Sequence, residues 1–196
     1  MKVVAILLAA GSATRFGSDK LLHTLPHEVP IAIQAARHLK AVFDDKVLAV
    51  VRPDALELAE RLRAEGCGVV VCGNAAEGMG ASLACGVRAA NAAGGADAYL
   101  VALADMPFIR SSSIAAVRDA LVAGAPLAAP YFRARRGHPV GIGAKYRADL
   151  EALQGDEGAK KIIAANETSL LKIPVGDPGV LRDIDTPGDL APPAIV

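Results

Sequence analysis

The stretch VVAILLAAGSATRFGSDK, from Val3 to Lys20, is the most informative part of the sequence for the fold. Its first six residues are all apolar, which is typical of a strand buried on both faces. The next twelve residues are mostly small and include two cations, Arg15 and Lys20. An apolar strand followed directly by such a loop predicts the first strand and the first ligand-binding turn of an open α/β sheet.

The rest of the chain continues this pattern of short apolar runs alternating with helical periodicity. Further strands are expected at 46–51, 69–72, 99–103 and 127–131, and helices at 31–41, 55–65, 82–92 and 113–123. After residue 131 we expect a loop and strand within 133–143, helices at 146–153 and 159–165, and a last strand at 170–175. The sequence therefore predicts one domain, 1–196, with a Rossmann-like three-layer αβα architecture and a mostly parallel sheet.

Composition excludes several classes of function. The 21 Lys and Arg residues balance the 21 Asp and Glu residues, so no net field favours nucleic acid or a membrane surface as partner. There is no run of 18 apolar residues that could cross a bilayer. The N-terminus superficially resembles a signal peptide, but charged residues follow closely, and a cytoplasmic location is expected.

The loop after the first strand has the chemistry of a phosphate site. Ala9, Ala10, Gly11 and Ser12 have little side-chain bulk, so their backbone N–H groups can approach a ligand closely, and Arg15 and Lys20 supply positive charge. Neither the Walker pattern nor the GxGxxG dinucleotide pattern is present. On composition alone, a surface loop that merely carries two cations is the alternative.

Carboxylates follow two other predicted strands. Asp105, in ALADMP, is a candidate Mg²⁺ ligand, because a carboxylate at the end of an apolar strand needs a cation as partner. Asp183 and Asp185, in RDIDTPGDL, share one face of their segment, and one of them could complete the metal site. A turn or cap role for Asp105, and a salt bridge from the pair to Arg182 or Arg15, are the alternatives. Serines 111–113 are expected to cap the helix that follows.

Two smaller motifs lie near predicted strand ends. GNAAEGMGASLACGV places Gly78, Gly80 and Ser82 at the start of a helix, where a flat base could bind edge-on. GHPVG places His138 beside a proline, where the imidazole could contact a substrate or only anchor a loop. We therefore treat Gly80 and Ser82 as candidate nucleotide-binding residues and His138 as a candidate on the acceptor side.

Six motifs together resemble, in order and spacing, the nucleotidyltransferases that attach a nucleotide to the molybdenum cofactor. They are LLAAGSATRFGSDKLL, EGMGASLACGV, LADMP, GHPVG, GDEGAKKI and DIDTPGDL. The likeness spans Val3 to about Leu190 and is strongest to the molybdenum cofactor cytidylyltransferases. This resemblance implies transfer of CMP from CTP to molybdopterin with release of pyrophosphate and a requirement for Mg²⁺. It also implies a molybdenum hydroxylase, or its chaperone, as recipient of the product.

The same resemblance implies roles for individual residues. Arg15 and Lys20 would hold the triphosphate and act with Asp105 in catalysis, and Asp105 and Asp185 would hold Mg²⁺. His138 would face the acceptor. The nucleotide would lie against the first loop and the third predicted helix, contacted by Leu8, Ala9, Ala10, Gly11, Ser12, Gly80 and Ser82. Guanylyl-transferring relatives carry Gly-Gly at positions 9 and 10, so the alanine methyl groups should narrow the base pocket toward a pyrimidine.

Three other functions compete with this interpretation. A nucleotidyltransferase of the same fold could use another phosphorylated acceptor, such as a sugar phosphate or methylerythritol phosphate. Some proteins that resemble the family are oxidoreductases that use flavin or nicotinamide, but the retained Arg15, Lys20, Asp105 and Asp185 argue against redox chemistry. A partner protein that binds nucleotide without turnover is the third alternative.

Overall fold

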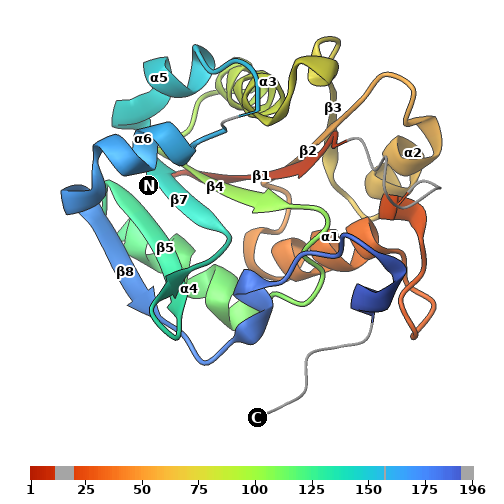
Figure 1. Ribbon diagram of the computed structural model, residues 1–196. Coiled ribbons are helices and arrows are strands. Elements are labelled where there is room, and N and C mark those ends of the chain that lie inside the picture. The colour runs from red at the N-terminus through yellow and green to blue at the C-terminus, as the bar shows by residue number, and fades with distance from the viewer. Residues whose placement is uncertain (12–19, 157, 191–196) are drawn as a thin grey trace.

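The computed structural model describes residues 1–11, 20–156 and 158–190 and contains one mixed sheet (Figure 1). The strand order is β3-β2-β1-β4-β7-β5-β6, and β8 pairs with β5 on a separate branch. All strands except β6 and β7 run in the same direction. The strands are β1 Val3–Ala9, β2 Val47–Val51, β3 Gly68–Val71, β4 Ala98–Leu103, β5 Leu127–Phe132, β6 Arg135–Arg136, β7 Val140–Gly143 and β8 Leu170–Pro174.

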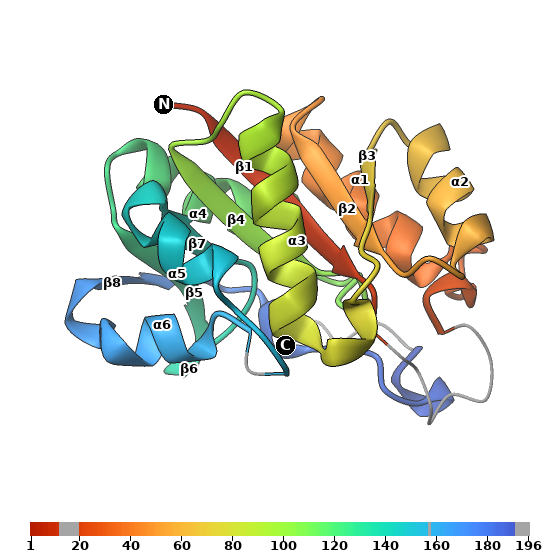
Figure 2. The ribbon, with the colours of Figure 1, turned by 90° about the horizontal axis from the view of Figure 1, so that it is seen from above.

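Helices cover both faces of this sheet, which confirms the predicted three-layer αβα fold (Figures 1 and 2). One face packs against α1 Ile31–Phe43, α2 Leu56–Ala64 and α4 Ser111–Val122. The other face packs against α3 Met79–Ala92, α5 Arg147–Glu151 and α6 Lys160–Ala165. Alternate residues of the buried strands enter opposite cores, as the two-residue period of a strand requires.

Glycines mark the C-terminal ends of three helices. Gly66, Gly94 and Gly124 follow helices with φ of +80°, +101° and +95°, the left-handed region that favours glycine. The prediction that serines 111–113 cap the fourth helix is wrong. Arg110 is the N-cap, and Ser113 lies inside the first turn, where its hydroxyl donates to Asp177 at 2.8 Å.

The antiparallel strand β7 matters for the site because it lies between β4 and β5, with Val140 opposite Val101. The strand therefore starts at the edge where the parallel strands end. This arrangement brings the residues just before β7, including His138, to the edge of the sheet that carries Asp105. No helix among the described residues is long and apolar enough to cross a bilayer.

Candidate active site

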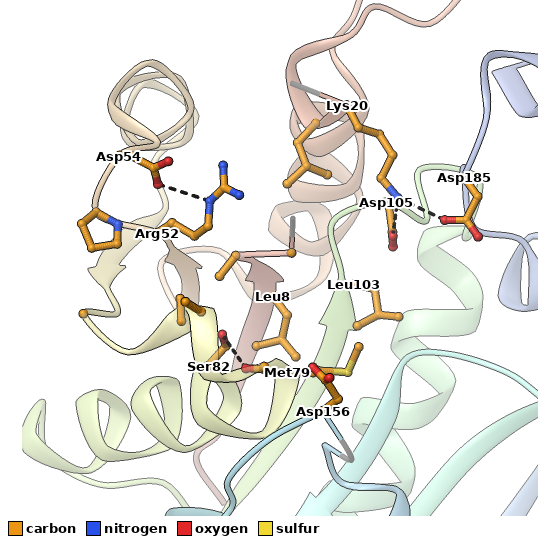
Figure 3. Close-up of a pocket in the computed structure, with 18 residues that line it drawn as sticks. Leu8, Lys20, Arg52, Asp54, Met79, Ser82, Leu103, Asp105, Asp156 and Asp185 are labelled. Carbon is orange, nitrogen blue, oxygen red and sulfur yellow. Dashed lines mark hydrogen bonds and ion pairs between the residues drawn. The ribbon is translucent and has the colours of Figure 1, made fainter. Parts of the chain in front are cut away.

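A cavity of about 720 Å³ lies beyond the carboxyl ends of β1 to β4 (Figure 3). This is the edge at which open α/β sheets bind their ligands. The residues that line the cavity come from seven separate segments of the chain: Leu8, Ala10, Gly11, Lys20, Leu21, Arg52, Pro53, Asp54, Gly73, Ala75, Ala76, Gly78, Met79, Ser82, Leu103, Asp105, Asp156 and Asp185.

Lys20 joins the two predicted metal ligands at one end of the cavity. Its ammonium Nζ lies 2.9 Å from Oδ2 of Asp105 and 3.4 Å from Oδ1 of Asp185. The Lys20 side chain is 12% exposed, whereas that of Asp185 is 59% exposed. Burial lowers the pKa of the Lys20 ammonium, but the charges and hydrogen bonds of the two carboxylates outweigh burial and hold that pKa above its usual value. Lys20 is therefore a permanent cation at neutral pH.

The structure distinguishes the two aspartates that the sequence left as alternatives. Ile184 is fully buried between them and donates its N–H to the carbonyl of Asp105 at 2.9 Å. Asp185 consequently faces Lys20, whereas the charge of Asp183 acts on His138. Arg182, one of the two alternative partners, instead donates to the carbonyl of Asp189 at 3.0 Å. Arg15, the other, lies outside the described residues.

The turn that carries Asp185 is fixed by a third carboxylate. Asp189 accepts hydrogen bonds from the backbone N–H of Asp185 at 3.2 Å and from the N–H and hydroxyl of Thr186 at 2.8 Å each. These bonds, those from Thr186 above all, hold the pKa of Asp189 below its usual value. The chain after Thr186 forms a single 3-10 turn, Pro187–Leu190.

The end of β1 and the two residues after it contribute Leu8, Ala10 and Gly11 to the cavity wall. The side chains of Leu8 and Ala10 belong to the core under α3. Ala9 is 3% exposed and packs in the opposite core, under α1. The Ala9 methyl group therefore cannot narrow the base pocket, and this part of the prediction is wrong because strand alternation separates the two alanines.

The third helix places only one of its two predicted residues in the cavity wall. Ser82 lines the cavity, and its hydroxyl donates to the carbonyl of Gly78 at 3.2 Å. Gly80 does not line the cavity, and its N–H donates to the carbonyl of Gly155 at 2.6 Å. The backbone of Gly80 is thus used by the protein itself. Ser12 and Arg15 lie outside the described residues.

His138 lies at the same edge as Asp105 but does not line the cavity. Within the described part of the chain, its Nδ1 is buried without a hydrogen-bond partner. Burial above all, together with the charge of Arg136, lowers the pKa of the imidazole to about 4, although the backbone of Val101 and the charge of Asp183 act in the opposite direction. His138 is therefore neutral at physiological pH.

Because His138 is neutral in the folded protein, we expect the free energy of unfolding to depend on pH. The unfolded chain binds a proton on His138 near pH 6.5 and the folded chain only near pH 4, so stability falls as the pH drops through this window. The loss attributable to His138 is at most about 3 kcal/mol. Urea unfolding of the wild type and of His138→Gln between pH 4 and 7 measures it. Parallel pH profiles for the two proteins would contradict the assignment.

Two further cavity residues that the sequence analysis did not select also follow the carboxyl end of a strand. Arg52 and Asp54 follow β2, form an ion pair at 3.2 Å and line the cavity opposite the Asp105 side (Figure 3). Their position directly after the predicted strand 46–51 could have identified them as candidate site residues. Asp156 also lines the cavity, but it follows no strand, and its sequence gives no such signal.

Comparison with known proteins identifies the family. The model of the MobA-like NTP transferase domain matches residues 5–170, which include Lys20, Asp105 and most of the cavity wall. The chain belongs to the MobA-like NTP transferase family. This confirms the family resemblance found in the sequence, and it makes the cavity the candidate active site of a nucleotidyltransferase.

Three known proteins are similar to this MobA-like protein in sequence or in structure. The purine catabolism protein PucB of Bacillus subtilis is 30% identical over 94% of this chain and 92% of its own. Rv0371c of Mycobacterium tuberculosis has a TM-score of 0.79 at 21% identity, covering 96% of this chain and 95% of that one, and a complex of Rv0371c with manganese is also solved. Mth528, a nucleotidyl transferase from Methanothermobacter, has a TM-score of 0.77 at 22% identity, covering 96% and 94%.

The carboxylates of this MobA-like transferase fit a divalent cation that is shared with substrate. Across the described ranges, no three His, Cys, Asp or Glu side chains gather as a metal site. Asp105 and Asp185 instead offer two hard oxygen ligands on either side of Lys20. Mg²⁺ in phosphoryl-transfer sites commonly uses one or two carboxylates and takes its remaining ligands from water and phosphate oxygens. The donor set therefore suits a nucleotide-bound Mg²⁺.

Proposed function

We propose that this protein transfers CMP from CTP to the terminal phosphate of molybdopterin, the organic part of the molybdenum cofactor. An oxygen of that phosphate attacks the α-phosphorus of CTP in line and forms a new P–O bond. The bond between the α-phosphorus and the oxygen that bridges to the β-phosphate breaks, and its electron pair leaves with pyrophosphate. The observation that carries the proposal is the Lys20–Asp105–Asp185 cluster at one end of a nucleotide-sized cavity.

Each charged residue of the cluster has a role under this proposal. The raised pKa of Lys20 keeps its ammonium charged, so it can neutralise the phosphates and the charge that develops on the leaving pyrophosphate. Arg15 is proposed to act on the same phosphates. Asp105 hydrogen-bonds Lys20 at 2.9 Å, which positions the ammonium before the nucleotide binds.

Asp105 and Asp185 are the residues that would hold Mg²⁺. When bound, the metal would supply charge neutralisation on the triphosphate and help to orient it. The manganese complex of the structural neighbour Rv0371c supports a divalent cation in this fold. Asp185 lies beyond residue 170, where the match to the family model ends, so its role rests on its geometry beside Lys20.

The preference for CTP over GTP is proposed to depend on the Ala10 methyl group, which lines the cavity next to Leu8. Replacing Ala10 by glycine should relax the discrimination against GTP about tenfold, because one methyl group in an apolar pocket has an effect of that order. The measurement is kcat/KM for both nucleotides. Ala9→Gly is the matched control: its methyl group packs in the opposite core, so the ratio should not change. Equal ratios for Ala10→Gly and the wild type would contradict this role.

The acceptor is proposed to bind beyond Asp105, toward β7, where His138 and Asp183 lie. A molybdenum hydroxylase or its chaperone would then receive the product. The relative PucB is named for purine catabolism, and under this proposal the chain supplies cofactor to an enzyme of such a route.

The decisive experiment measures pyrophosphate release from CTP in the presence of purified molybdenum cofactor. We expect Mg²⁺-dependent release with CTP and little with GTP. Release with a sugar phosphate or methylerythritol phosphate, but not with the molybdenum cofactor, would assign a different acceptor. Binding of CTP without release in the presence of active acceptor would instead identify a nucleotide-binding partner protein.

A further inference from the structure

The segment Gln154–Asp156 packs directly on the start of α3, about 75 residues earlier in the chain. The N–H of Gly80 donates to the carbonyl of Gly155 at 2.6 Å. A Cβ at Gly80 would lie 2.7 Å from the carbonyl oxygen of Gln154, and one at Gly78 would overlap Oδ1 of Asp156. Gly78 also has φ of +125°, which L side chains rarely adopt. Both glycines are thus needed for this segment to approach the helix.

This close approach delivers the Asp156 side chain to the cavity. Asp156 lines the cavity with Met79, Leu8 and Leu103, and its carboxylate points into the space between them (Figure 3). The residue is exposed, and its carboxylate has no hydrogen-bond or ion-pair partner within residues 1–11, 20–156 and 158–190. The other carboxylates of the cavity differ in this respect, because Asp54, Asp105 and Asp185 each pair with a cation.

The position of Asp156 restricts what it can bind. Phosphates belong at the Lys20 end, and a carboxylate without a cation would repel them. Gly73, Ala75 and Ala76 also line the cavity, and their small side chains suit contact with a flat base. Asp156 lies apart from both groups, on the side of the cavity opposite Lys20 (Figure 3). The part of a nucleotide between base and phosphates is the ribose, whose hydroxyls are hydrogen-bond donors.

We propose that Asp156 accepts hydrogen bonds from the ribose hydroxyls and selects ribonucleotides over 2′-deoxyribonucleotides. An ionised carboxylate only accepts hydrogen bonds, and its two oxygens suit two neighbouring hydroxyl donors. The inference rests on the proposed function, since it assumes that a nucleotide occupies the cavity. Asp156 is then a specificity-determining residue that reaches the substrate from a loop distant in sequence.

The test compares binding of CTP and 2′-deoxy-CTP by calorimetry, without acceptor, for the full chain. We expect the wild type to bind CTP at least about tenfold more tightly, because charge-assisted hydrogen bonds contribute on that scale. Asp156→Ala should reduce the ratio to near one, and Asp156→Asn, which keeps one acceptor oxygen, should give an intermediate ratio. Asp149→Asn is the matched control, an exposed carboxylate on α5 outside the cavity.

The outcomes separate the two proposals. If the wild type binds CTP and Asp156→Ala keeps the full ribose preference, the role of Asp156 is wrong while the proposed function stands. If the wild type binds both nucleotides equally, the role of Asp156 is also wrong. If the wild type binds neither CTP nor any other nucleoside triphosphate, the proposed function itself fails. Circular dichroism of each variant confirms that the fold is retained.

Discussion

Asp105→Asn is expected to reduce CTP turnover at least about 100-fold while the protein remains folded. The substitution keeps the size of the side chain but removes its negative charge. The Asp105 carboxylate pairs with Lys20 at 2.9 Å and is the proposed ligand of the metal ion. Asp105 is half-buried just after β4, and its backbone carbonyl accepts a hydrogen bond from the N–H of Ile184. Because the substitution leaves this backbone bond in place, the local geometry should persist. Steady-state pyrophosphate release at saturating Mg²⁺ gives the effect.

A matched control for this variant is Asp119→Asn. Asp119 also pairs with a cation, Arg118 at 2.7 Å, but it lies on α4 away from the cavity, and its removal should leave turnover unchanged. If Asp105→Asn is as active as this control, Asp105 is not the essential carboxylate. If added Mn²⁺ partly restores the variant, the metal role is supported over a role in positioning Lys20 alone.

Asp177→Ala is expected to reduce the free energy of unfolding by about 4 kcal/mol. Asp177 is 3% exposed and accepts hydrogen bonds from the N–H of Arg110 at 2.9 Å, the hydroxyl of Ser113 at 2.8 Å and the N–H of Gly179 at 3.0 Å. Alanine leaves these three donors without their acceptor, and each buried donor so left costs roughly 1–3 kcal/mol. Urea unfolding measures the change.

Asp177→Asn should be less damaging, because its carbonyl oxygen can still accept one or two of these bonds. The same carboxylate ties the start of α4 to the segment that ends in Asp185, so turnover should fall in Asp177→Ala even at temperatures where the variant is fully folded. A stability equal to that of the wild type would show that water satisfies the three donors.

Much of the fold could be predicted because its signals are local. Apolar runs and helical periodicity identify the strands and helices, and the carboxyl ends of parallel strands meet at one edge. That rule is sufficient to bring Lys20, Asp105 and Asp185 together from three separate loops. Pairing direction has no comparable local signal, and so the sequence did not reveal that β7 would insert antiparallel between β4 and β5.

The parts of the site that sequence reasoning missed depend on contacts between distant segments. Asp156 reaches the cavity only because Gly78 and Gly80 admit its backbone, and Asp177 meets Ser113 across 64 residues. The error at Ala9 is different in kind. Strand alternation already separates Ala9 from Ala10, so the correct assignment was available from the sequence.

The Lys20–Asp105–Asp185 cluster has a consequence for the order of events during synthesis. Its three residues emerge from the ribosome at widely separated times, and Asp185 emerges after every strand of the sheet. A nascent chain that has completed its sheet still lacks the carboxylate that faces Lys20 from the C-terminal side. The complete charged cluster therefore forms only after Asp185 has been made, so a shorter nascent chain would not yet present the full Lys20–Asp105–Asp185 cluster at this end of the cavity.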